Sequence, residues 1–216
     1  MSLAVVGDIH GEAVLLEKMW RRLAPEGRTV VFTGDYVNRG PQSKEVITLL
    51  AEICSSTRNV VLLWGNHEIS LLNYLCRGKF KSFLQLGGLA TLQSYLKNPS
   101  GDVHSAFLNA FPQSHRKFLS QLQRCYETPD WLVSHAGCDP LNPESRSFRA
   151  MVTGHHGDLF RTDLQLPKPV VCGHYVQKSR VPYTSPFVVC IDTGCGVGGP
   201  LTAILLPERN ILSIAP

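Results

Sequence analysis

The chain has 216 residues, of which 44% are hydrophobic, and it carries a formal net charge of +4 with a pI near 8.7. This length and hydrophobicity predict a single domain, residues 1–216, around one substantial core. Its lysines and arginines are dispersed, which argues against a nucleic-acid-binding stripe, and no run of about 18 apolar residues predicts a membrane span.

The N-terminal sequence and the cysteines indicate the cellular compartment. MSLAVVGDIHG lacks a basic region followed by a long apolar stretch, so no secretory signal is predicted. The seven cysteines are an odd number and include no CxxC pair. Reduced, mostly buried thiols are the simplest explanation, and we therefore predict a cytoplasmic protein.

Three strand–loop–helix units follow one another at the start of the chain. Apolar patterns predict strands at 3–6, 29–33 and 59–64, and helices at 12–23, 43–53 and 68–76. The strands end in Gly7-Asp8, Gly34-Asp35 and Gly65-Asn66. Successive units of this kind pair their strands in parallel, and polar residues at the carboxyl ends then meet at a ligand-binding edge of the sheet.

The chain changes character after the third unit. From about residue 80 to 124, helical patterns at 89–96 and 115–122 predict a helical cap or insertion beside the sheet. Strands are predicted again at 131–133, 169–172, 187–191, 201–206 and 211–214. Their short turns favour a largely antiparallel second sheet. The predicted class is α/β (α+β), with two sheets face to face and helices outside.

Candidate metal ligands follow the predicted strands. They are Asp8, His10, Asp35, Asn66, His135 and His174. Asp8 and His10 are two residues apart in an extended segment, so they face the same side and can share one ion. Asp35 can bridge two cations about 3.5–4 Å apart, and the imidazoles suit zinc, iron or manganese. Each motif alone occurs by chance, but together they indicate a two-metal site.

The motifs resemble those of the phosphoprotein phosphatase branch of the calcineurin-like metallophosphoesterases. The matching segments are GDIHG (7–11), GDYVNRG (34–40), GNHE (65–68), His-Ala-Gly (135–137), Gly-His (173–174) and the closing IDTGCGVGGPLTAILLPE (191–208). The short chain is most similar to bacterial and phage serine/threonine protein phosphatases. This resemblance implies the calcineurin-like metallophosphoesterase fold, with two mixed β-sheets packed face to face and flanking helices.

The resemblance also implies a role for each site residue. Asp8 and His10 would hold the first metal, Asp35 would bridge, and Asn66, His135 and His174 would hold the second. Arg39 matches the arginine that binds substrate phosphate, and Arg161 is similar to a second such arginine on a shorter match. His67 is implied as the general acid and a water activated by two divalent cations as the nucleophile. Manganese is the expected metal, with iron and zinc as alternatives.

Position 38 departs from the family pattern GDxVDRG, whose aspartate stabilises the protonated catalytic histidine. Asn38 has no negative charge, so we predict a lower pKa for His67 than in relatives that keep the acid. A weaker acid would suit nucleotide or phenolate leaving groups better than a serine alkoxide. The asparagine is equally compatible with a deliberate inactivating substitution, or with a side chain that still orients the ring through its amide oxygen.

Three functions follow from these residues. The main prediction is a phosphoric monoester hydrolase, a metal-dependent serine/threonine or dual-specificity protein phosphatase. The alternative is a hydrolase of diadenosine tetraphosphate or another nucleotide polyphosphate. The third is a catalytically silent phosphate-binding scaffold. The expected partner is accordingly a phosphorylated protein or a nucleotide, with no membrane and no nucleic acid.

Overall fold

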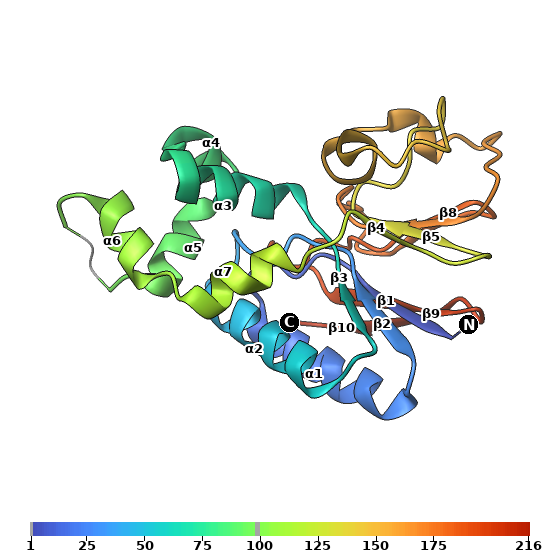
Figure 1. Ribbon diagram of the computed structural model, residues 1–216. Coiled ribbons are helices and arrows are strands. Elements are labelled where there is room, and N and C mark those ends of the chain that lie inside the picture. Colours follow the sequence, from blue (N-terminus) through green and yellow to red (C-terminus); the bar gives the residue numbers. More distant parts are fainter. Residues whose placement is uncertain (1, 98–99) are drawn as a thin grey trace.

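The computed structural model describes residues 2–97 and 100–216. Within these residues two five-stranded sheets face each other, and helices lie along the outer side of the first sheet (Figure 1). Both sheets combine parallel with antiparallel pairs. The predicted fold, two mixed β-sheets packed face to face with flanking helices, is confirmed.

The first sheet is built on the units predicted at the start of the chain. Its order is β10-β9-β1-β2-β3, with β1 (Leu3–Val6), β2 (Thr29–Phe32), β3 (Val60–Leu62), β9 (Leu201–Leu206) and β10 (Asn210–Ile214). The first three strands are parallel, and β9 runs antiparallel to β1. Our assignment of the last two strands to the second sheet is wrong, because an apolar strand pattern does not specify which sheet a strand joins.

The second sheet is less antiparallel than we predicted. Its order is β4-β5-β6-β8-β7, with β4 (Cys125–Glu127), β5 (Leu132–Ser134), β6 (Val170–Cys172), β7 (Tyr183–Thr184) and β8 (Val188–Cys190). The central pairs β5–β6 and β6–β8 are parallel, whereas the edge pairs are antiparallel. Segments 135–169 and 173–187 are long enough to return the chain to the same end of the sheet, as parallel pairing requires.

Alternating residues of β1 point into two different hydrophobic layers. Leu3 and Val5 belong to the layer between the sheets, and Ala4 and Val6 pack in the layer toward α1 (Ala13–Leu23) and α2 (Ser43–Ser56). A strand buried on both faces is apolar throughout, which explains the run LAVV. On the far side of the second sheet, η2 (Arg149–Thr153) and η3 (Gly157–Phe160) cover a third cluster.

The helical segment extends beyond one end of the sheets (Figure 1). α3 (Asn66–Arg77) leads from the sheet edge into this segment, which contains α4 (Phe80–Gln85), α5 (Gly88–Tyr95), α6 (Val103–Ala110) and α7 (Gln113–Ser120). Tyr74 stacks on Phe83 with ring centroids 4.9 Å apart, and Phe107 packs edge-on against Tyr95 at 5.3 Å. In the described part of the chain, no helix combines the length and apolarity needed to cross a bilayer.

Candidate metal centre

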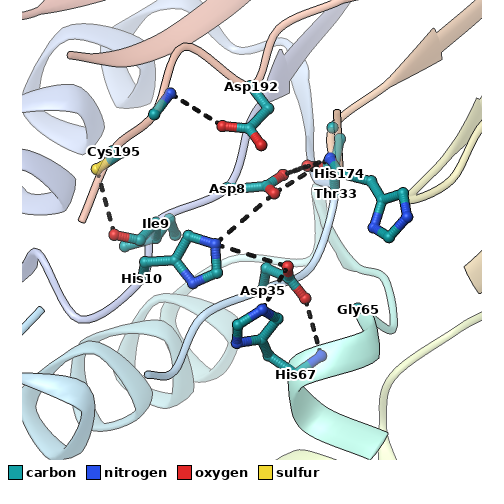
Figure 2. A network of polar contacts seen from close by, with 12 residues as sticks. Asp8, Ile9, His10, Thr33, Asp35, Gly65, His67, His174, Asp192 and Cys195 are labelled. Atoms are coloured by element: carbon teal, nitrogen blue, oxygen red, sulfur yellow. Dashed lines mark hydrogen bonds and ion pairs between the residues drawn. The ribbon is translucent and has the colours of Figure 1, made fainter. Parts of the chain in front are cut away.

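The predicted ligands converge at the carboxyl ends of strands from both sheets. Asp8, His10 and Asp35 follow β1 and β2, and their side chains point toward one another in Figure 2. Asn66 is the first residue of α3, which follows β3. His135 directly follows β5, and His174 lies two residues after the end of β6. Two facing sheets therefore bring the candidate ligands together.

The turns that carry these side chains have left-handed backbone. Positive φ values occur at His10 (47°), Asp35 (55°), Asn38 (72°), Arg39 (66°) and His174 (65°). Non-glycine residues rarely adopt this region, and such strain persists where surrounding contacts over-determine it. Its concentration here indicates a site whose side-chain directions are fixed by the fold.

Two glycines allow the backbone to approach the carboxylates closely. A side chain at Gly173 would collide with the carboxylate of Asp8, and one at Gly65 would collide with that of Asp35. Because Gly173 leaves that space free, the Asp8 carboxylate accepts a hydrogen bond from the His174 backbone N–H, at 3.1 Å to Oδ2. These positions require glycine for space rather than for flexibility.

The environment of His10 fits a bound cation. Its Nδ1 lies 3.0 Å from the carbonyl oxygen of Val37, which can only accept, so the proton of the neutral ring is on Nδ1 and Nε2 has a lone pair. Nε2 is buried and has no hydrogen-bond partner among the described residues. It lies 3.6 Å from Asp35 Oδ2 and 3.9 Å from Asp8 Oδ2. A lone pair facing two carboxylates is stabilised when a metal ion lies between them.

A second group of donor atoms lies on the other side of Asp35. His135 donates through Nδ1 to the carbonyl of Thr33 at 3.1 Å, which leaves Nε2 as a lone-pair donor. Asn66 Oδ1 lies 2.9 Å from His135 Nε2 and 3.0 Å from His174 Nδ1, and these two nitrogens are 3.1 Å apart. Adjacent ligands of an octahedral ion, each about 2.1 Å from it, are separated by about 3.0 Å. The three atoms thus fit one face of such an octahedron.

Asp35 lies between the two groups. Its Oδ2 is 3.6 Å from His10 Nε2, and its Oδ1 is 3.4 Å from His135 Nε2. Two sets of three side chains have donor atoms close enough together to hold one ion. One set is His10, Asp35 and His67, the other is Asp8, Asp35 and His135, and Asp35 belongs to both. This arrangement suits a carboxylate that bridges two cations.

Burial sets the protonation of the centre. It raises the pKa of Asp8, with a further contribution from the neighbouring Asp192 carboxylate (Figure 2), and it raises the pKa of Asp35 beside Glu68. Burial also lowers the pKa of His10 to about 3 and that of His174 to about 4. Both rings are therefore neutral near pH 7, in the form that binds metals. The neighbouring carboxylates of Asp8 and Asp35 favour the binding of a cation, which would offset their negative charge.

Glu68 organises the turn after β2, a role for which we found no sequence signal beyond its place in GNHE. Its buried carboxylate accepts backbone N–H bonds from Asp35 and Tyr36, both at 2.8 Å, from Gly65 at 3.1 Å and from Val37 at 3.2 Å. Desolvation raises its pKa to about 7, although these hydrogen bonds act in the opposite direction. Glu68 thereby fixes the backbone on which Asp35 is carried.

His67 and Asn38 are in direct contact, but not in the orientation that we considered. The amide nitrogen of Asn38, rather than its oxygen, lies 2.9 Å from His67 Nδ1, because the oxygen accepts the Thr91 hydroxyl at 2.8 Å. His67 Nε2 faces the centre, 3.6 Å from Asp35 Oδ2. Burial, followed by the charges of His10 and Arg39, lowers the pKa of His67.

The two predicted phosphate-binding arginines have different surroundings. Arg39 is half-buried, and its charge lowers the pKa of His10 and of Asp35, so the guanidinium acts on the centre. The Arg161 side chain is 60% exposed and pairs with Asp163 at 2.7 Å. Within residues 2–97 and 100–216 its hydrogen bonds and ion pairs include none with a candidate metal ligand. Its phosphate-binding role stays a prediction.

Known proteins resemble the chain over nearly its full length. A family model of calcineurin-like phosphoesterases matches residues 1–192. The bis(5′-nucleosyl)-tetraphosphatase PrpE (asymmetrical) of Halalkalibacterium halodurans is 26% identical over 239 residues, covering 99% of this chain and 94% of its own length. A crystal structure described as a proposed diadenosine tetraphosphatase has a TM-score of 0.66 at 26% identity, covering 99% of this chain and 93% of its own.

A protein-tyrosine phosphatase from a Shewanella species is similar in fold alone. Its TM-score is 0.64 at 17% identity, and the match covers 98% of this chain and 80% of that one. Such low identity carries no information on substrate. The two 26%-identical relatives, by contrast, are both named as tetraphosphatases.

Proposed function

The chain belongs to the calcineurin-like phosphoesterase family, and on that basis we propose that it is a hydrolase of nucleotide polyphosphates, with diadenosine tetraphosphate as the first candidate substrate. The observation that carries this proposal is the amide contact at His67, where the family pattern places a carboxylate. Tetraphosphatase relatives that align with 99% of the chain support it. The bond cleaved would be a phosphoanhydride rather than the monoester of our main prediction.

The proposed metal ligands divide into two sets that share one residue. Asp8 and His10 would hold the first ion, and Asn66, His135 and His174 the second, with Asp35 in common. When bound, two divalent ions supply Lewis acidity that activates water and offsets charge on the phosphate oxygens. Manganese is proposed first, with iron and zinc as alternatives, since N/O ligands of this kind accept all three.

Arg39 would hold the substrate phosphate beside the ions. Its planar guanidinium can donate two parallel hydrogen bonds to phosphate oxygens, which both orients the phosphorus and balances its charge. The backbone N–H of Arg39 is bound by the carbonyl of Gly87 at 3.2 Å, so the turn is fixed before substrate arrives. A preorganised donor of this kind stabilises charge without reorganisation during the reaction.

His67 would assist departure of the leaving nucleotide. Its Nε2 edge faces the centre and Asp35, while its Nδ1 edge meets the Asn38 amide where the family pattern places a carboxylate that would stabilise an imidazolium. A nucleotide phosphate is a weak base and departs with a hydrogen bond or a partial proton transfer, whereas a serine alkoxide needs a full proton. The site therefore suits an anhydride better than a phosphoserine ester.

A side-by-side assay tests the proposal. The protein is reconstituted separately with Mn²⁺, Fe²⁺ and Zn²⁺, and initial rates are measured on diadenosine tetraphosphate, a phosphoserine peptide and a phosphotyrosine peptide. We expect the highest kcat/KM on diadenosine tetraphosphate, by about tenfold or more, which corresponds to about 1.4 kcal/mol of differential stabilisation. Preference for either peptide would favour the protein phosphatase. Absence of turnover on all three substrates with both metals bound would refute the proposal and favour the catalytically silent phosphate-binding scaffold.

A further inference from the structure

We infer that Thr91, in helix α5 of the helical segment, is a positioning residue that determines which nitrogen of His67 carries the proton. It acts through Asn38: among the described residues, its hydroxyl hydrogen-bonds Asn38 and Ser43 and no candidate metal ligand. This inference rests on the proposed function, because it assigns His67 its hydrogen-bonding role toward the leaving nucleotide. The controlling feature is a hydrogen-bond chain that runs from Ser43 through Thr91 and Asn38 to His67.

All four members of the chain are buried. Ser43, Asn38 and Thr91 are each 0% exposed, and His67 is 1% exposed. Ser43 Oγ lies 3.0 Å from Thr91 Oγ1, which lies 2.8 Å from Asn38 Oδ1, and Asn38 Nδ2 lies 2.9 Å from His67 Nδ1. Bulk solvent does not reach these side chains, and they hydrogen-bond one another instead.

Proton counting gives the chain one direction. Within the described residues, Ser43 Oγ contacts only the backbone N–H of Asn38, at 3.1 Å, and Thr91 Oγ1. An N–H cannot accept, so the Ser43 hydroxyl must donate to Thr91. Thr91 in turn donates to Asn38 Oδ1, which leaves the amide NH₂ to donate to His67 Nδ1.

The opposite orientation of the amide is unfavourable. If Asn38 turned its oxygen toward His67, its NH₂ would donate to Thr91, and Thr91 would then donate to Ser43. The Ser43 proton would be buried without an acceptor in the described part of the chain. Ser43 and Thr91 together therefore hold the amide nitrogen against the imidazole.

The state of His67 follows from this direction. Because Nδ1 accepts a hydrogen bond, the neutral ring carries its proton on Nε2, the nitrogen that faces Asp35 Oδ2 across 3.6 Å. The enzyme thus presents an N–H donor to the leaving oxygen instead of an imidazolium. An aspartate at position 38 would accept from Nδ1–H and reverse this last hydrogen bond.

Thr91 also has a backbone contact, which must be separated from its effect on the ring. The Asn38 N–H lies 2.9 Å from Thr91 Oγ1, and it has a second acceptor in Ser43 Oγ. Support of the turn alone would matter equally whether residue 38 is asparagine or aspartate. Control of the amide direction matters only for asparagine, since both oxygens of a carboxylate can accept.

A double-mutant cycle tests the inference on metal-reconstituted protein. We expect Thr91→Val to lower kcat on diadenosine tetraphosphate about 10- to 100-fold, the range found for groups that orient a catalytic side chain, with KM within about threefold. In the Asn38→Asp background the same change should cost less than about threefold. Thr91→Ser should restore kcat. Thr202→Val controls for loss of a buried hydroxyl, because Thr202 is a buried threonine in β9 that does not belong to the Ser43–Thr91–Asn38–His67 hydrogen-bond chain.

Nitrogen NMR of the His67 ring provides a readout independent of turnover. In the zinc-loaded protein we expect an unprotonated Nδ1 and a protonated Nε2, an exchange-averaged mixture in Thr91→Val, and a protonated Nδ1 in Asn38→Asp. A protonated Nδ1 in the unsubstituted protein, or equal loss of kcat in both backgrounds, would overturn the inference. If diadenosine tetraphosphate proves not to be a substrate, the ring signals still decide this point, and the cycle can be run with p-nitrophenyl phosphate.

Discussion

The sheet edge and the helical segment contribute to the site in different ways. The edge supplies every candidate metal ligand, each within a few residues of a strand end. Helix α5 supplies no ligand, yet its Thr91 hydroxyl and the adjoining Gly87 carbonyl contact the Asn38–Arg39 turn. One region therefore provides the reactive groups, and the other determines how two of those groups are oriented.

The sheet edge contributes through the chemical type of its side chains, whereas the helical segment contributes by orienting side chains of the site. A ligand can be recognised by its type, because few side chains bind a cation. A threonine that fixes an amide has no special chemistry, and its role exists only through contacts between elements distant in the chain. Substitutions at the edge should therefore abolish metal binding, whereas those in the helical segment should change stability or selectivity with both metals still bound.

Asp35→Asn should give the largest effect. Loss of the shared carboxylate removes one ligand from both proposed ions, and we expect activity to fall by about 10³-fold or more, with metal content dropping below two per chain. Metal analysis and kcat on diadenosine tetraphosphate measure this. Asp130→Asn, at an exposed aspartate, is the matched control. Two retained metals with near-normal turnover would show that Asp35 is not shared.

Phe107→Ala tests whether the helical segment contributes through packing. Phe107 is fully buried and contacts Tyr74, Tyr95 and Phe111, so its truncation should lower the free energy of unfolding by about 3–5 kcal/mol. Urea denaturation measures this loss. Phe80→Ala, at a ring 45% exposed, should cost less than about 1 kcal/mol. Metal content should stay at the unsubstituted level in both variants, and loss of metal from Phe107→Ala would contradict the separation of the two regions.

Arg39→Ala and Arg161→Ala compare an arginine held at the centre with one on the surface. We expect kcat/KM on diadenosine tetraphosphate to fall about 100-fold for Arg39→Ala, as for removal of one preorganised donor. The exposed ion pair of Arg161 predicts a change below about threefold. An equal loss in both variants would mean that Arg161 also binds substrate phosphate, as the sequence resemblance implies.

Sequence patterns predicted the sheet edge far better than the helical segment's role. The strands 3–6 and 201–206 have the predicted bounds. The candidate ligands converge because polar residues that directly follow neighbouring strands meet at the same edge of a sheet. The sheet joined by β9 was not predictable, since its apolar residues are compatible with either sheet. Thr91 was missed because it lies 53 residues from Asn38 and 48 from Ser43, and no local pattern encodes that meeting.

The smallest expected effect concerns pH and the junction of α7 with α5 and α2. His115 is 4% exposed, with Nδ1 2.7 Å from the Tyr95 hydroxyl and Nε2 3.1 Å from Thr48 Oγ1. Burial, and secondarily the charge of Lys44, lowers its pKa from 6.5 to about 4. As pH falls below 6.5, the unfolded chain binds a proton that the folded chain refuses, so stability decreases until about pH 4 and then levels.

His115→Gln isolates this contribution. Between pH 7 and pH 4 the native protein should lose about 2 kcal/mol more than the variant, although the variant is less stable overall. Urea denaturation with a chelator present measures both proteins in the metal-free state. The buried histidines of the metal centre then titrate equally in both, so their contribution cancels in the difference. An identical pH dependence would place the proton uptake at the sheet edge instead of the helical segment.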